Sequence, residues 1–140
     1  MTCMNLKVLA IDDDHALTEL LTVLLKTHGF NVLTANSGED GVEITRKDSP
    51  DVIILDLMMP GMDGWQVLNQ IRKFSTVPIV VFSVLDSPGM VAKALDAGAD
   101  DYLVKPVPSG VLIALLNKLT RRADMNNGNK FKPQTAPFSA

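Results

Sequence analysis

The 140-residue sequence has a single cysteine, Cys3, and only 5% of its residues are aromatic. One cysteine excludes an intrachain disulfide and a cysteine-rich zinc site, and it favours a reducing compartment. Long hydrophobic runs are also missing. None approaches the roughly 18 residues that a membrane-spanning helix needs, and the first residues lack the apolar core of a signal peptide. We therefore expect a cytoplasmic protein that does not associate with membranes.

Excess positive charge is absent as well. The formal net charge is −3 and the sequence pI is about 5.2, a balance that argues against direct binding of nucleic acid by this segment. Hydrophobic residues, in contrast, make up 46% of the chain. They suit one domain with an aliphatic core that needs neither disulfides nor a structural metal.

Five short apolar runs alternate with longer stretches of helical periodicity. The runs predict strands at residues 6–11, 32–35, 52–55, 79–82 and 102–104. Helices are predicted between and after them, beginning after the capping residues Asp14, Ser37 and Asp63 or near residues 87 and 109, and ending near residues 28, 47, 74, 97 and 122. Strands that alternate with helices imply an α/β fold: a doubly wound, three-layer αβα sandwich around a parallel sheet.

The composition changes near the end of the chain. Residues 123–140 are polar, contain Pro and Gly, and lack periodicity, which is typical of a flexible tail or a linker. The predicted organisation is one folded domain over residues 1–122, followed by a flexible tail or truncated linker over residues 123–140.

Polar residues stand where the predicted strands end. Asp12 and Asp13 follow the first strand, Asp56 the third, Ser83 the fourth and Lys105 the fifth. The carboxyl ends of parallel strands meet at one edge of an open α/β sheet, and ligands bind in the crevice outside that edge. We therefore expect these side chains, which are distant in sequence, to form one site.

Three carboxylates that lie close together repel one another, and a hard divalent cation relieves the repulsion. All-oxygen ligands without a nearby cysteine or histidine favour Mg²⁺, or Mn²⁺, over zinc. Asp56 would then act as a nucleophile toward a phosphoryl group, with Lys105 and the Ser83 hydroxyl stabilising the phosphoryl oxygens. The sequence has no Gly-rich Walker loop, so the phosphoryl donor need not be a nucleotide.

This ordered set of motifs resembles the receiver domain of two-component response regulators, of which the chemotaxis regulator is the single-domain type. The resemblance spans residues 5–122. It rests on the acidic pair, on Asp-Leu-Met-Met-Pro-Gly-Met-Asp-Gly beginning at Asp56, on Ser83, and on Gly-Ala-Asp-Asp-Tyr-Leu-Val-Lys-Pro ending at Pro106. It implies a flavodoxin-like (CheY-like) fold with five parallel strands in the order 2-1-3-4-5.

The resemblance also implies phosphorylation-dependent signalling. As the phosphoacceptor, Asp56 would take a phosphoryl group from the phosphohistidine of a sensor histidine kinase or a histidine phosphotransfer protein. The metal would be held by Asp12, Asp13, Asp56 and the backbone carbonyl of Met58. Such a domain catalyses only its own phosphorylation and dephosphorylation, so it would not be an enzyme on an external substrate.

Further roles follow from the same resemblance. Ser83 and Tyr102 would form a switch pair, in which the hydroxyl turns toward the phosphate and the tyrosine rotates inward. That change would remodel the surface built from the fourth and fifth helices. The Lys105–Pro106 peptide bond is cis in this family.

Two regions depart from the family's usual pattern, the residue after Ser83 and the last predicted helix. The residue after Ser83 is Val84, where receivers often have Ala or Gly, so we expect slower or more selective phosphoryl transfer. The last predicted helix contains Val111-Leu-Ile-Ala-Leu-Leu116, more apolar residues than one face can use. Receivers of the winged-helix branch dimerise through charged residues, but Val111 and Leu115 stand at the corresponding places. An apolar homodimer, effector docking at the last helix or the tail folding back is expected instead.

Other functions fit the sequence less well. A receiver-fold interaction module that works without phosphorylation stays open as the alternative. A haloacid-dehalogenase-like phosphohydrolase also uses a strand-terminal aspartate with Mg²⁺, but it needs a second aspartate where Met58 stands. A flavodoxin-type protein needs a hydroxyl-rich phosphate loop after the first strand, and the acidic residues there would repel a flavin phosphate.

Overall fold

Strands and helices alternate through residues 6–125, the part of the chain that the computed structural model describes, with side chains described through Arg121. In chain order the elements are β1 (Lys7–Ile11), α1 (His15–Thr27), β2 (Asn31–Ala35), α2 (Gly38–Asp48), β3 (Val52–Leu55), α3 (Gly64–Arg72), β4 (Ile79–Ser83), α4 (Pro88–Asp96), β5 (Asp101–Val104) and α5 (Ser109–Met125). The strands pair in parallel in the order β2-β1-β3-β4-β5. The predicted α/β sandwich and its strand order are confirmed.

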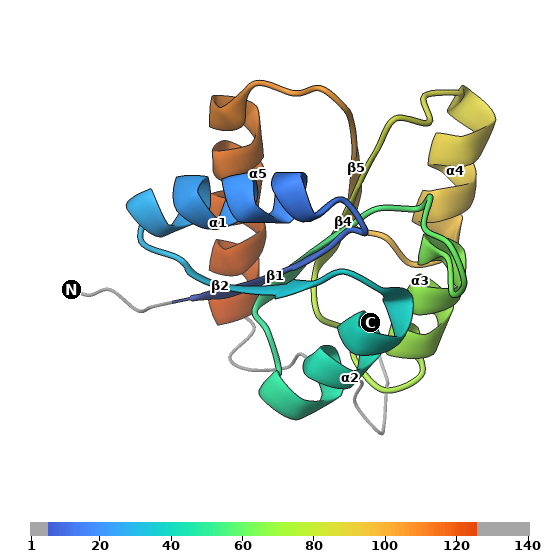
Figure 1. The fold of residues 1–140 in the computed structure, drawn as a ribbon, viewed down its shortest axis with the longest axis horizontal. Coiled ribbons are helices and arrows are strands. Elements are labelled where there is room, and N and C mark those ends of the chain that lie inside the picture. The colour runs from blue at the N-terminus through green and yellow to red at the C-terminus, as the bar shows by residue number, and fades with distance from the viewer. Residues whose placement is uncertain (1–5, 126–140) are drawn as a thin grey trace.

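Alternate side chains of the central strands enter two separate cores. In β1, Val8 and Ala10 pack with α1 and α5, whereas Leu9 and Ile11 pack with α2, α3 and α4. The two helix layers cover opposite faces of the sheet (Figure 1). Every residue of β3 and β4 is buried. Strands covered on both faces need apolar side chains at almost every position, which explains the continuous apolar runs in the sequence.

A capping side chain starts each of the first four helices. Asp14, Ser37, Asp63 and Ser87 each accept a hydrogen bond from the backbone N–H three residues further on, which satisfies a donor that the helix itself leaves unpaired. At Asp63 the reciprocal bond is also present, so the capping box is complete. After α1 the chain turns at Gly29, whose φ of 89° lies in the left-handed region. The predicted caps are confirmed.

Two helix ends differ from the prediction. α3 stops at Arg72, because the N–H groups of Lys73 and Phe74 donate to carbonyls three residues back instead of four. α5 continues to Met125, past the predicted end near residue 122, since no Gly or Pro interrupts it there. Residues 126–140, which hold most of the predicted tail or linker, lie outside the described part of the chain, as does Cys3. No helix within residues 6–125 is long and apolar enough to cross a membrane.

Gly64 lies where α3 meets the loop after β3. Its N–H donates to the Leu57 carbonyl at 3.0 Å, and a Cβ added here would lie 2.5 Å from the Leu57 Cα and still closer to the Asp56 carbonyl. Both neighbours are backbone, which cannot rotate away as a side chain can. Glycine at this position therefore sets how closely the start of α3 approaches the residues that follow β3.

Replacing Gly64 with Ala should lower the free energy of unfolding by about 1–3 kcal/mol, because the extra methyl group overpacks against backbone. Urea denaturation measures this. The matched control is Gly89→Ala, at the second residue of α4, where an added Cβ has nothing within 4 Å, so its stability should stay equal or rise slightly. Equal stability of the Gly64→Ala protein and the unmodified protein would contradict the proposed contact.

Candidate functional site

Asp12 and Asp56 are the first residues beyond two neighbouring strands, β1 and β3. Backbone hydrogen bonds fix both: the Asp56 N–H donates to the Ile11 carbonyl and the Asp12 N–H to the Ala35 carbonyl, each at 3.0 Å. The two aspartates are only 4% and 6% exposed. Two carboxylates are thus held at one edge of the sheet with little access to water.

Asp13 completes an acidic cluster with these two residues. One carboxylate oxygen from each of Asp12, Asp13 and Asp56 lies within 4.8 Å of the others, and Asp13 is exposed. The Lys105 Nζ donates to Asp12 Oδ2 at 2.8 Å and lies 4.0 Å from Asp56 Oδ1. The structure therefore brings four of the predicted site residues together, and one ammonium lies beside two of the three carboxylates.

The environment raises the pKa of Asp56 above its usual range. Burial is the largest cause and the negative charge of Asp12 is the next. Lys105 and the N–H of Met58, which donates to Asp56 Oδ1 at 3.3 Å, oppose these effects without cancelling them. Ionised Asp56 is therefore held in surroundings that disfavour its charge, and a cation would relieve that penalty.

Ser83 and Tyr102 are connected through the backbone of Leu85. Ser83 is completely buried, and its Oγ accepts a hydrogen bond from the Leu85 N–H at 3.3 Å. The Tyr102 hydroxyl donates to the Leu85 carbonyl at 2.6 Å, and its side chain is buried. Burial raises the pKa of the Tyr102 phenol, so the hydroxyl stays a hydrogen-bond donor. One peptide segment after β4 thus contacts both residues of the predicted switch pair.

The remaining predicted residues surround this cluster. Met58 is 52% exposed, and its N–H contacts Asp56 as described above. The Lys105 N–H donates to the Ser83 carbonyl at 2.8 Å, so these two residues are adjacent across β4 and β5. The Lys105–Pro106 peptide bond is cis, as the resemblance implies.

Asn36 supports the position of Asp12, a role that the sequence did not predict. Its Nδ2 donates to the Asp12 carbonyl at 2.7 Å and to the Thr18 Oγ1 at 3.1 Å. It therefore joins the loop that carries Asp12 to α1. Its position in the sequence could have predicted this role. Asn36 directly follows β2 and so lies at the same edge of the sheet as the other site residues.

Comparison with known proteins identifies the family. A family model described as the response regulator receiver domain matches residues 8–117. The chain belongs to this family. The motif at Asp56, the acidic pair and Lys105 therefore stand in a receiver domain, and the fold and family expected from the sequence are confirmed.

Two curated relatives of this receiver domain are bacterial regulators. The transcriptional regulatory protein AfsQ1 of Streptomyces coelicolor is 41% identical over 117 residues. The response regulator MprA of Mycobacterium leprae is 42% identical over 118 residues. Each alignment covers 84% of this chain and 52% of the relative, so the chain spans about half the length of these relatives.

Solved receiver domains have the same fold. The receiver domain of the Francisella response regulator 1452 superposes with a TM-score of 0.80 at 33% identity, covering 85% of this chain and 99% of that one. The BeF3-activated receiver domain of Klebsiella pneumoniae RstA gives a TM-score of 0.79 at 32% identity, covering 82% and 98%.

The raised pKa of Asp56 predicts how stability depends on pH. A carboxyl whose pKa is higher in the folded than in the unfolded chain binds its proton more tightly when folded, so stability falls as the pH rises from the ordinary value of 3.8 through the folded-state value. In metal-free buffer, Asp56→Asn should therefore raise the free energy of unfolding at pH 7. This advantage should vanish below pH 3.8, where Asp56 is protonated in both states.

Urea denaturation with EDTA across this pH range measures the effect. The control is Asp86→Asn, which removes an exposed carboxylate outside the acidic cluster and should change stability little. If the Asp56→Asn protein is less stable than the unmodified protein at pH 7, the electrostatic account of the site is wrong.

Proposed function

We propose that Asp56 is the phosphoacceptor of this receiver domain, and that the donor is the phosphohistidine of a sensor histidine kinase or a histidine phosphotransfer protein. The observation that carries the proposal is the buried Asp56 carboxylate, positioned at the end of β3 beside Asp12 and 4.0 Å from the Lys105 ammonium. Receiver domains are generally not enzymes on an external substrate, and the reaction proposed here modifies the domain itself.

In the proposed step, an Asp56 carboxylate oxygen attacks phosphorus and forms a P–O bond as the P–N bond to histidine breaks. The bonding electron pair leaves with the imidazole nitrogen, which then takes up a proton. Lys105 is close enough to both carboxylates to stabilise negative charge on a phosphoryl group bound between them. The Ser83 hydroxyl would donate its hydrogen to a phosphoryl oxygen.

The donor set fits Mg²⁺, or Mn²⁺. Three carboxylates against one ammonium leave two negative charges uncompensated, and every side-chain ligand is oxygen. Asp12, Asp13, Asp56 and the Met58 carbonyl would hold the ion. A bound ion would supply positive charge, which would reduce the repulsion between these carboxylates and an incoming phosphoryl group.

The proposed switch works through the segment after β4. If Ser83 turns to donate to a phosphoryl oxygen, the hydrogen bond that it accepts from the Leu85 N–H changes, and Leu85 is also the acceptor for Tyr102. The tyrosine side chain packs in the core on the α4 side of the sheet. Phosphorylation is thereby coupled to the surface formed by α4, β5 and α5.

That surface is also the proposed contact for an effector or a second copy of the chain. Four apolar residues of α5 are buried by the fold itself, namely Leu112, Ile113, Leu116 and Leu119. Three large apolar side chains stay exposed, one on each element: Leu95 (44%), Val104 (37%) and Val111 (46%). Light scattering tests the second of these contacts. A monomer both with and without a phosphate mimic would exclude the homodimer and leave effector docking as the proposed contact.

Phosphorylation by acetyl phosphate tests the proposed function. With Mg²⁺, the unmodified protein should give a retarded band on a phosphate-affinity gel, whereas Asp56→Asn or added EDTA should reduce the band to background. Asp86→Asn is the control and should be phosphorylated normally. Phosphorylation that persists in Asp56→Asn would exclude Asp56 as the acceptor. An unmodified protein that is never phosphorylated yet binds its partner would favour the interaction module.

The Val84 side chain should slow the approach of a phosphoryl donor to Asp56. It is 58% exposed immediately after the buried Ser83, and it shares one surface cavity with Lys105 and Pro106. Val84→Ala should therefore speed phosphorylation by acetyl phosphate by several-fold, up to about tenfold, which equals ~1.4 kcal/mol of activation free energy. Initial rates by phosphate-affinity gel measure this. Val111→Ala, an equally conservative change on the surface of α5, should leave the rate unchanged, and equal rates for both variants would rule out the steric effect.

A further inference from the structure

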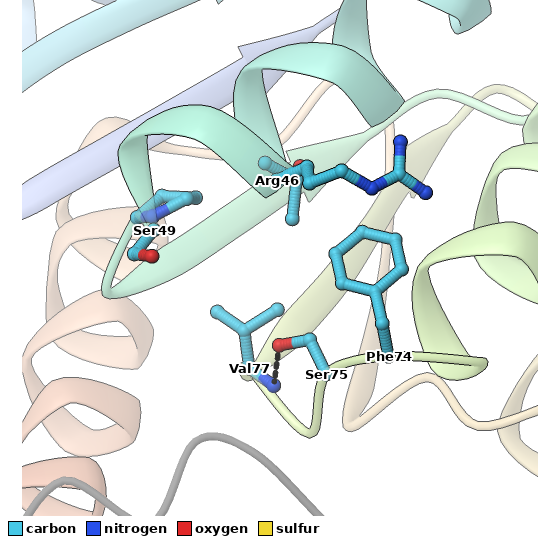
Figure 2. Close-up of a pocket in the computed structure, with 7 residues that line it drawn as sticks. Arg46, Ser49, Phe74, Ser75 and Val77 are labelled. Carbon is cyan, nitrogen blue, oxygen red and sulfur yellow. Dashed lines mark hydrogen bonds between the residues drawn. The ribbon is translucent and has the colours of Figure 1, made fainter.

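A cavity of about 240 Å³ lies at the edge of the sheet opposite Asp56. It is formed by the last turn of α2 and by the connection between α3 and β4 (Figure 2). Pro50 and Val77 are buried in its wall. The Phe74 ring forms another wall, and the Arg46 guanidinium lies 4.6 Å from the ring centroid. The cavity therefore offers an aromatic and aliphatic lining next to a cation.

The size of the cavity suits one aromatic side chain. An apolar cavity of roughly 150 Å³ is enough to bind benzene, so a phenyl ring fits here with room to spare. Aromatic rings also gain from packing against one another at an offset or edge to face, and the Phe74 ring provides such a partner.

α5 carries the chain to this edge. The helix contacts β3, and Leu119 packs in the same core as Val52, the first residue of that strand. Val52 is two residues from Pro50 in the cavity wall. The last turns of α5 thus lie close to the edge where the cavity is found, and Figure 2 shows this helix beside the turn between α2 and β3.

The sequence beyond α5 supplies an aromatic residue within reach. Phe131 is six residues past Met125. Six residues of extended chain reach roughly 20 Å.

We propose that residues 126–140 of this chain dock at the cavity between α2 and the α3–β4 connection, with the Phe131 ring inserted against Phe74. The docked segment would fix the route by which the chain leaves α5, on the side of the domain away from the acidic cluster.

NMR spectroscopy of the intact chain tests the proposal. We expect nuclear Overhauser effects between the aromatic protons of Phe131 and the methyl groups of Val77. Phe131→Ala should abolish these signals and shift the backbone amide resonances of Phe74 and Val77. Phe138→Ala is the matched control, since it removes the other phenylalanine of the segment and should leave those resonances in place.

Three outcomes would overturn the proposal. Resonances of Phe74 and Val77 that are the same in the unmodified and Phe131→Ala proteins would show that Phe131 does not occupy the cavity. If these resonances shift in the Phe138→Ala protein but not in the Phe131→Ala protein, Phe138 occupies the cavity. Overhauser effects seen only between differently labelled molecules in a mixed sample would assign the cavity to a second copy of the chain.

Discussion

The backbone pairing of β1 with β3 is the constraint on which the site depends. Its register sets Ile11 opposite Leu55, so the next residues, Asp12 and Asp56, leave the sheet at the same level. A slip of one residue in either strand would turn its side chains to the opposite face. Because both strands are buried on both faces, a slip would also exchange the two cores. The packing that stabilises the sheet is therefore what holds the carboxylates together.

The same pairing creates the electrostatic conflict at the site. Strand ends that meet at one edge force Asp12 and Asp56 together in a buried place, and the raised pKa of Asp56 is the consequence. Lys105 reaches the cluster from β5 and compensates only part of the charge. The residues proposed to carry the chemistry are thus expected to weaken the unliganded fold, which is a common relation between active groups and stability.

The sequence predicted the elements and the acidic cluster because both have a pattern. Buried strands are apolar runs, and Asp12, Asp56 and Lys105 are charged residues that follow such runs. Contacts to the backbone leave no such pattern. The Leu85 carbonyl that accepts from Tyr102 belongs to a residue whose side chain gives no sign of this role. The cavity beside Phe74 likewise depends on how two irregular connections pack, which no periodicity in the sequence describes.

The two edges of the sheet are joined by α5. The helix begins shortly after Lys105 at the acidic edge and ends beyond Leu119, which belongs to the same buried cluster as Val52 at the start of β3. A strand of four residues, such as β3, spans about 13 Å, so groups at the cavity cannot touch the carboxylates directly. Under the two proposals, phosphorylation at Asp56 would reach the segment at the far edge through an element that joins the two edges, such as α5. Leu112, Leu116 and Leu119 resist movement of α5, because burial packs them tightly against the strands. The exposed side of α4, β5 and α5 is not restrained by such burial. A structural change that follows phosphorylation would therefore spread more easily along this surface.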